Sequence, residues 1–278
     1  MKKIQFSVSM CVYGKDDPQW FDRAVASVLD QTAPPDELVL VVDGPVPGEL
    51  DGIIKKYEAR DPVRVIRLEV NQGHGNARRI GLENCSYELV ALMDADDISV
   101  PDRFEKQVAV FEADEAVAIA GGQIMEFVED VERPVGFRTV PLTDKEIKEY
   151  LKKRCPFNQQ TVMFRKSQVF RAGGYLDWYC DEDYYLWIRM HLAGMKFANL
   201  PDVLVNVRVG EDMYNRRGGW KYFRSEWKLQ NFMLKNKVIG LPVYVMNVAK
   251  RLIVQVLLPQ RLRGWVFRKF ARNSTKNG

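Results

Sequence analysis

Histidine and cysteine are scarce in this chain. Among 278 residues there are two histidines, His74 and His191, which cannot build a zinc site by themselves. The four cysteines lie far apart and form no Cys-X-X-Cys pair. This spacing indicates reduced thiols in a cytosolic protein.

Long apolar runs are also missing. No stretch reaches the length that a transmembrane helix requires. The first ten residues enter a predicted strand at once and lack the apolar core of a signal peptide. No low-complexity run, internal repeat or nucleic-acid recognition motif is present. We therefore expect a cytoplasmic globular protein that does not bind nucleic acid.

Acidic residues are absent from residues 242–278, although the net charge of the whole chain is only +4. This segment carries eight lysine and arginine residues among many aliphatic and aromatic ones, at helical spacing. The combination predicts a pair of interfacial helices on an anionic membrane surface. The alternative is a helical pair that packs on the protein and has a solvated basic face.

A regular alternation of predicted strands and helices is the main positive feature. Short apolar segments rich in valine predict buried strands at 6–12, 37–42, 63–68 and 89–93, with helices between them. This pattern is typical of an α/β fold with a parallel, doubly wound sheet. Further along, the sequence predicts strands at 117–128 and 203–209, helices at 143–153 and 181–194, and helix after Gly219.

Three carboxylates, Asp94, Asp96 and Asp97, follow the predicted strand at 89–93. Carboxylates grouped at the end of a buried strand repel one another, and a hard cation relieves that repulsion. Oxygen ligands suit Mg²⁺ or Mn²⁺, and this edge of an open α/β sheet is where ligands bind. The alternative is an acidic turn in which Asp96 or Asp97 caps a helix that begins near Pro101.

Polar residues also end two other predicted strands, Tyr13-Gly14 after the first and Asp43-Gly44 after the second. They should share the edge with the acidic cluster. Asp43 is suited there to accept a hydrogen bond from a nucleobase, although Asp-Gly-Pro is also a strong turn sequence.

A glycine-rich turn at 71–75 leads into a helix that carries Arg78 and Arg79. The first turn of such a helix is suited to a diphosphate, because free N–H groups and arginines attract anions. The turn matches no standard phosphate-binding motif. We interpret His74 as a loop residue rather than a ligand.

The predicted helix at 181–194 begins with three acids, Asp181, Glu182 and Asp183. Acids in the first turn of a helix are favoured by the helix dipole alone, so these carboxylates do not by themselves indicate a functional site.

In their order and spacing, these motifs resemble those of the family 2 glycosyltransferases with a GT-A fold. Within that family the chain is similar to the bacterial group that builds capsule, O-antigen and exopolysaccharide units, including amylovoran-type enzymes. The resemblance depends on Val12-Tyr13, Val41-Val42-Asp43-Gly44, Asn71-Gln72-Gly73, Ala77-Arg78, Leu92-Met93-Asp94-Ala95-Asp96-Asp97, Pro101-Asp102-Arg103, and Glu182-Asp183 with Leu186-Trp187-Ile188-Arg189.

The resemblance implies a Rossmann-like GT-A domain at 1–215, with a mixed, mostly parallel sheet flanked by helices. The remaining residues, 216–278, would form a C-terminal helical, basic and amphipathic segment that associates with a membrane.

The resemblance also implies roles for single residues. Asp43 would bind the uracil of a UDP-sugar, with Val12 and Tyr13 as walls of the base site. Asp94 would contact the ribose, and Asp96 would bind the Mg²⁺ or Mn²⁺ that bridges the diphosphate.

Two further implied roles are those of Asp183 as the catalytic base and of Arg78 beside the nucleotide. The family usually places Asn where this chain has Arg79, so the chain departs from the family pattern in this loop. Arg216 and Arg217 are candidates for a loop that closes on the diphosphate. The candidates for the sugar or acceptor pocket are Gln123, Asn158, Gln159, Glu182 and Trp187.

The expected function is inverting, metal-dependent transfer of a hexose (galactose, glucose or an N-acetylhexosamine) from a UDP-sugar. The expected acceptor is a lipid-linked saccharide of bacterial surface polysaccharide synthesis, at the cytoplasmic face of the inner membrane. The alternative is a non-catalytic protein of the same fold that binds UDP-sugar or docks an assembly complex. Asp94, Asp96 and Asp183 favour the enzyme.

Overall fold

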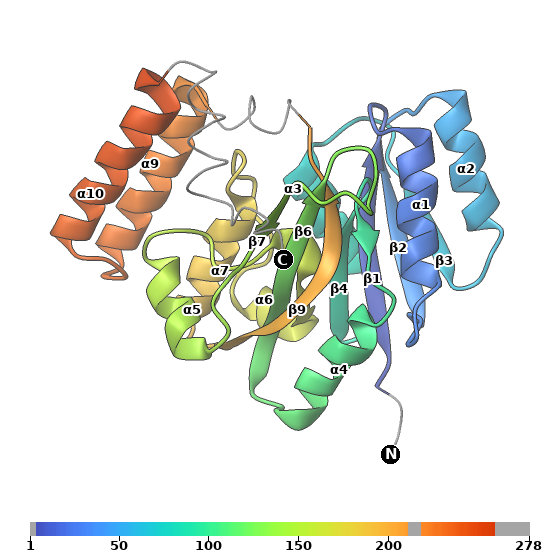
Figure 1. Ribbon diagram of the computed structural model, residues 1–278, viewed down its shortest axis with the longest axis horizontal. Helices are drawn as coiled ribbons and strands as arrows, with labels where there is room; N and C mark the ends of the chain where they lie inside the picture. Colours follow the sequence, from blue (N-terminus) through green and yellow to red (C-terminus); the bar gives the residue numbers. More distant parts are fainter. Residues whose placement is uncertain (1–3, 211–217, 259–278) are drawn as a thin grey trace.

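The computed structural model describes residues 4–210 and 218–258, and places one curled sheet between two layers of helices (Figure 1). The strands are β1 (Phe6–Tyr13), β2 (Glu37–Asp43), β3 (Val63–Arg67), β4 (Leu89–Asp94), β5 (Ile98–Ser99), β6 (Val117–Phe127), β7 (Gly136–Arg138), β8 (Met163–Arg165) and β9 (Lys196–Arg208). The α-helices are α1 (Pro18–Leu29), α2 (Gly48–Glu58), α3 (His74–Asn84), α4 (Arg103–Ala113), α5 (Asp144–Leu151), α6 (Lys166–Arg171), α7 (Glu182–Leu192), α9 (Trp220–Lys235) and α10 (Leu241–Leu252). Short 3₁₀ and π turns span Gln159–Thr161 and Ile253–Leu257.

The first half of the sheet is parallel. Strands β3, β2, β1 and β4 lie side by side in that order. Along β2, Leu38 and Leu40 face the apolar core that α1 and α2 cover, whereas Val39 and Val41 face the core that α3 covers. Both faces are buried, which is why these strands read as continuous apolar runs.

The second half of the sheet is mixed. It continues from β4 through β8, β6 and β9 to β5, with β8 antiparallel to both of its neighbours and β9 parallel to β6. The mixed, mostly parallel α/β sheet predicted from the sequence is confirmed. Strands β5 and β7 were not predicted, because two or three residues are too few to show a periodicity.

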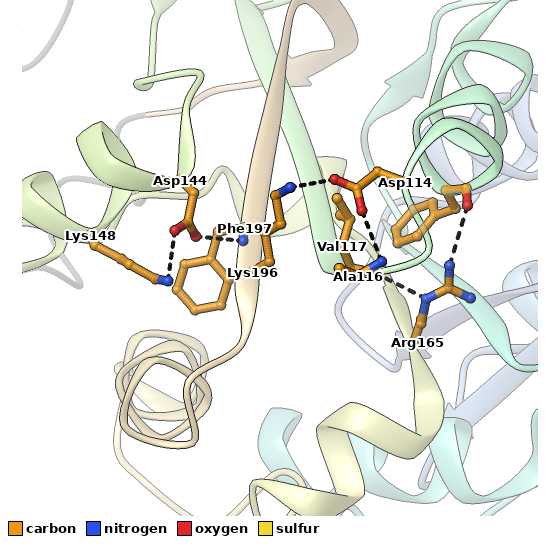
Figure 2. A network of polar contacts seen from close by, with 9 residues as sticks. Asp114, Ala116, Val117, Asp144, Lys148, Arg165, Lys196 and Phe197 are labelled. Atoms are coloured by element: carbon orange, nitrogen blue, oxygen red, sulfur yellow. Dashed lines mark hydrogen bonds and ion pairs between the residues drawn. The ribbon is translucent and has the colours of Figure 1, made fainter.

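A polar network fixes the end of the sheet at which β6 and β9 begin (Figure 2). Asp114, just before β6, pairs with Lys196, the first residue of β9. The carboxylate of Asp144 accepts a hydrogen bond from the backbone N–H of Phe197 at 2.8 Å. Because β9 is anchored at this end and runs parallel to β6, its last residue, Arg208, reaches the opposite edge of the sheet.

Three elements begin at other residues than the sequence predicts. Helix α3 begins at His74, because Gly73 has a φ of 83° and turns the chain directly into the helix. Helix α4 begins at Arg103 rather than near Pro101, and β9 begins at Lys196 rather than at 203.

Helices α9 and α10 pack on the domain. Leu229 and Met233 of α9 belong to the same apolar core as Trp187 of α7. The Asn247 amide of α10 donates to the carbonyl of Lys152 at 2.9 Å. The predicted domain boundary between residues 215 and 216 lies outside the described residues. Among the helices that the structure describes, none is long and apolar enough to cross a bilayer.

Candidate active site

The carboxyl ends of β1, β2 and β4 meet at one edge of the sheet. Tyr13 lies opposite Asp43 in the β1–β2 register, and Cys11 lies opposite Asp94 in the β1–β4 register. The polar residues that the sequence predicts at strand ends are therefore neighbours on adjacent strands.

Asp43 is 5% exposed and organises the loop that precedes α3. Its two carboxylate oxygens accept hydrogen bonds from the backbone N–H groups of Gln72 at 2.7 Å and Gly73 at 3.0 Å. Tyr13 is 37% exposed beside it, whereas Val12 is 1% exposed and packs in the core. Tyr13 therefore has exposed surface that a nucleobase could contact, whereas Val12 has almost none.

Arg78 is buried between the acidic cluster and the start of α7. Its Nη2 lies 2.7 Å from Oδ1 of Asp94. Burial opposes its charge, but the charges of Asp94 and Glu182 raise the pKa of Arg78 above its usual value. Arg79, the residue that departs from the family pattern, points elsewhere and pairs with Glu83 at 2.7 Å.

The three carboxylates of the acidic cluster have separate environments. The side chains of Asp94 and Asp96 are 31% and 40% exposed, whereas Asp97 is 2% exposed. Oδ1 of Asp97 accepts a hydrogen bond from the backbone N–H of Arg208 at 2.9 Å, which ties β9 to the end of β4. Burial and the charge of Asp96 raise the pKa of Asp97 well above its usual range.

The acidic cluster does not cap the following helix. The residue that precedes α4 is Asp102, and its side chain makes no capping hydrogen bond. Asp96 instead pairs with Arg208, whose Nη2 lies 3.2 Å from its Oδ2. Burial, followed by the charge of Asp94, raises the pKa of Asp96.

The cluster fits a divalent cation that arrives with a phosphate ligand. In the described part of the chain, no group of three His, Cys, Asp or Glu side chains is arranged to hold a metal ion by itself. Asp94 and Asp96 nevertheless present two partly exposed carboxylates that are separated by one residue in the chain. Mg²⁺ is commonly held by one or two carboxylates together with substrate phosphates and water, so this donor set fits such an ion.

Asp183 lies in the first turn of α7 and is half-buried. Its Oδ1 accepts a hydrogen bond from the backbone N–H of Tyr184 at 2.6 Å. Burial, together with the negative charge of Glu182, raises the pKa of Asp183 to about 6. A carboxylate with this pKa is ionised near neutral pH and is a stronger proton acceptor than an ordinary aspartate.

The pKa of Glu182, the neighbour of Asp183, is shifted in the opposite direction. Its Oε1 lies 3.4 Å from Nδ1 of His74. Burial opposes ionisation, but His74 and the charge of Arg78 lower the pKa of Glu182. His74, interpreted from the sequence as a loop residue, is the first residue of α3 and connects that helix to α7.

The structure corrects part of the predicted sugar or acceptor pocket. Trp187 and Asn158 have no exposed surface. Trp187 packs against Phe157 with ring centroids 5.5 Å apart, and the Asn158 amide donates to the carbonyl of Gly122 at 2.8 Å. These two side chains stabilise the fold and do not line a pocket.

Gln123 and Gln159 are 5% and 8% exposed. The Gln123 amide donates to the carbonyl of Leu200 at 2.7 Å, and the Gln159 amide donates to the hydroxyl of Tyr175 at 3.0 Å. Their predicted place in the pocket stays a prediction, as does that of Glu182. Arg216 and Arg217 lie outside the described residues.

Two residues of this edge were not predicted from the sequence. The carboxylate of Asp16 accepts a hydrogen bond from the backbone N–H of Tyr13 at 2.9 Å, and burial, with the charges of Asp96 and Asp94, raises its pKa to about 6. Arg208 reaches the cluster from the end of β9. The available signal was the single charged residue in the mostly apolar strand predicted at 203–209.

Comparison with known proteins agrees with the family that the sequence motifs resemble. Residues 7–174 match the family described as Glycosyl transferase family 2. A glycosyltransferase of Haemophilus influenzae is 42% identical over 92% of this chain and 96% of its own length. The amylovoran biosynthesis glycosyltransferase AmsE of Erwinia amylovora is 40% identical over 84% of this chain and 88% of its own length.

A third relative is the UDP-Gal:alpha-D-GlcNAc-diphosphoundecaprenol beta-1,3-galactosyltransferase of Escherichia coli. It is 34% identical over 96% of this chain and 97% of its own length. Among solved structures, S. aureus TarS in complex with UDP-GlcNAc superposes with a TM-score of 0.67, at 16% identity, over 95% of this chain and 79% of that chain. A mannosyltransferase from Pyrobaculum calidifontis in complex with GDP-Man and Mn²⁺ has a TM-score of 0.62, at 14% identity, over 96% and 80% of the two chains. At these identities the two structures support the fold alone.

Proposed function

The chain belongs to glycosyltransferase family 2, and from this premise we propose that it transfers a hexose from a UDP-sugar, with inversion, to a lipid-linked saccharide. The prediction of a glycosyltransferase with a GT-A fold is confirmed. The hexose would be galactose, glucose or an N-acetylhexosamine, and the product would be a unit of a bacterial surface polysaccharide. The non-catalytic alternative has no observation in its favour.

The observation that carries the proposal is the buried Arg78. It contacts Asp94 on the nucleotide side, and its charge acts on both Glu182 and Asp183 at the start of α7. One guanidinium thus connects the proposed donor side of the site, at Asp94, with the proposed acceptor side, at the start of α7. In the proposal, Tyr13 and Asp43 bind the uracil and Asp94 binds the ribose.

In the reaction that we propose, Asp183 takes the proton from the acceptor hydroxyl as that oxygen bonds to the anomeric carbon. The bond between that carbon and the UDP oxygen breaks on the opposite face, which inverts the configuration. A divalent cation held by Asp96, when bound, supplies positive charge to the departing diphosphate. Arg78 keeps Asp94 in place and limits the rise in the pKa of Asp183.

A UDP donor is supported by the E. coli relative, whose name includes UDP-Gal, and by the complex of TarS with UDP-GlcNAc. The Mn²⁺ of the Pyrobaculum mannosyltransferase complex supports a divalent cation. A panel of UDP-sugars, each with Mn²⁺ or Mg²⁺, tests the proposal through slow hydrolysis of the donor. We expect UDP release from one hexose donor only, and its absence with every donor would contradict the proposal.

The lipid-linked acceptor is supported by the E. coli relative, whose name specifies a diphosphoundecaprenol acceptor, and by the outer face of α10. Five residues at four-residue spacing, Leu241, Val245, Ala249, Ile253 and Leu257, form an exposed apolar stripe on this helix and the turn after it. In residues 218–258 the one acidic side chain, Glu226, is buried against Arg251. We propose that this stripe and the surrounding lysines lie on the anionic inner leaflet.

Co-sedimentation with vesicles tests the membrane surface. We expect Val245→Glu to reduce binding to anionic vesicles, because a carboxylate would enter the apolar stripe. Val135→Glu is the matched control, since Val135 is as exposed as Val245, 55% against 56%, but lies outside the C-terminal helices. Equal binding by the two variants would contradict the membrane surface and leave the transfer reaction untouched.

A further inference from the structure

Each partly exposed carboxylate of the acidic cluster is paired with one arginine. Asp94 pairs with Arg78 at 2.7 Å, and Asp96 pairs with Arg208 at 3.2 Å. The two arginines are not equivalent, because the Arg78 side chain is 6% exposed and the Arg208 side chain is 31% exposed. Arg78 is fixed in the core, whereas Arg208 lies at the surface of the site.

The main chain of Arg208 is held firmly and its side chain more weakly. Its backbone N–H donates to Asp97, and the next residue, Val209, donates to the carbonyl of Phe127 at 2.8 Å. The guanidinium lies over the ring of Trp20, with Cζ 5.3 Å from the ring centroid. Its Nε is buried and has no hydrogen-bond partner, so the guanidinium is left with an unused donor.

The contact between Arg208 and Asp96 occupies an oxygen of the predicted metal ligand. A cation that uses this oxygen must first displace the guanidinium. Exposed ion pairs of this kind contribute only about 0–1 kcal/mol to stability, so displacing the guanidinium costs little free energy. Once released, a guanidinium is well suited to a diphosphate, which it binds with two parallel hydrogen bonds.

We propose that Arg208 is a resident counter-ion that competes with the divalent cation for Asp96 and is released when the cation arrives with the diphosphate of the donor. Arg208 thereby weakens binding of the cation alone and strengthens binding of the cation together with the nucleotide. This inference rests on the proposed function, in which Asp96 is the metal ligand.

The test compares four forms of the full chain: wild type, Arg208→Gln, Arg23→Gln and Asp96→Asn. Arg23 is a matched control, because its Cζ lies 4.4 Å from the centroid of the same Trp20 ring. Mn²⁺ binding is measured by electron paramagnetic resonance without nucleotide, and UDP affinity is measured by calorimetry at saturating Mn²⁺.

For Arg208→Gln we expect Mn²⁺ alone to bind about two- to fivefold more tightly than to wild type. UDP should bind about tenfold more weakly to the same variant. Arg23→Gln should match wild type in both measurements. The opposite signs of the two effects distinguish a counter-ion from a residue that only stabilises the fold, whose loss would weaken both.

Unchanged or weaker Mn²⁺ binding by Arg208→Gln, with binding lost in Asp96→Asn, would overturn the inference and leave the metal site in place. Equal Mn²⁺ binding by wild type and Asp96→Asn would overturn the proposed metal site and the inference with it. If Arg208→Gln does not fold, Arg208→Lys replaces it. Lysine keeps the charge but loses the planar fork, so UDP affinity should fall while Mn²⁺ affinity stays near that of wild type.

Discussion

Replacement of Asp183 by asparagine should abolish transfer while leaving the fold more stable. Asparagine keeps an oxygen that accepts the 2.6 Å hydrogen bond from the backbone N–H of Tyr184, but it cannot accept the proton of the acceptor hydroxyl. Loss of a general base typically costs about 10²–10⁴-fold in rate. UDP affinity should not change, because Asp183 is proposed to act on the acceptor.

In the proposed reaction, the pKa of Asp183 sets the pH dependence of the wild-type enzyme. With a value of about 6, the carboxylate is mostly ionised at pH 7.5. Below pH 6 the base becomes protonated, so kcat/KM should fall about tenfold for each pH unit. An ordinary aspartate would place this fall about two units lower.

The same pKa determines the effect of the substitution on stability. The pKa in the folded state is raised from 3.8 to about 6, so the folded protein binds this proton more tightly than the unfolded chain does. Stability is therefore lost as pH rises through this window, and the ionised carboxylate costs on the order of 2–3 kcal/mol at neutral pH. Asp183→Asn removes this cost, so its melting temperature should exceed that of wild type at pH 7.5 and approach it at pH 4.

Glu182→Gln is the control, since its pKa is lowered in the folded state and its charge stabilises the protein above the ordinary pKa of glutamate. That variant should be less stable than wild type at pH 7.5. Transfer is measured with a saturating acceptor, and stability by calorimetry at both pH values. Normal turnover by Asp183→Asn would refute the assignment of the base. An inactive Asp183→Asn that is also less stable at pH 7.5 would refute the reasoning from its pKa.

Two other substitutions test the nucleotide loop and the attachment of the C-terminal helices. Asp43→Ala leaves the N–H groups of Gln72 and Gly73 without their acceptor, so calorimetry should show UDP affinity reduced about tenfold or more. Unchanged affinity would show that Asp43 has no part in the nucleotide site. Arg251→Ala leaves the carboxylate of Glu226 buried without its partner, where the two side chains are 14% and 10% exposed. Denaturant unfolding should show that Arg251→Ala lowers the free energy of unfolding by about 3–5 kcal/mol. Lys250→Ala, which changes an exposed neighbour, should lower it by less than about 0.5 kcal/mol. Equal losses in the two variants would contradict a buried ion pair.

The sheet and its functional edge could be predicted because both depend on local sequence. Buried parallel strands produce apolar runs, and the polar residues that end them, such as Asp43 and Asp94, must share one edge. The contact of Arg208 with Asp96 could not be predicted in this way, because the two residues are 112 positions apart. Only the long path of β9 along β6 brings them together.

The role of a buried amide could not be predicted from the sequence either. Gln123 lies where the pairing of β6 with β9 shifts register. Its amide donates to the carbonyl of Leu200 and accepts from the backbone N–H of Val140 at 2.6 Å, which satisfies polar groups that the interrupted ladder leaves unpaired. In a sequence, such an amide cannot be distinguished from one that binds a sugar hydroxyl. Burial is the information that separates the two roles, and it depends on the whole fold.

The shared core of α7 and α9 has a consequence for how such enzymes diversify. Leu229 and Met233 fill the same core as Trp187, four residues after Asp183 on α7. A chimera that joined this sheet to the C-terminal helices of a relative would disturb the packing beneath Asp183, the proposed base. The outward positions, such as Val245, are free of that constraint. New acceptor or membrane preferences should therefore arise through substitutions on the outer face of α10, and not through exchange of α9 and α10 as one unit.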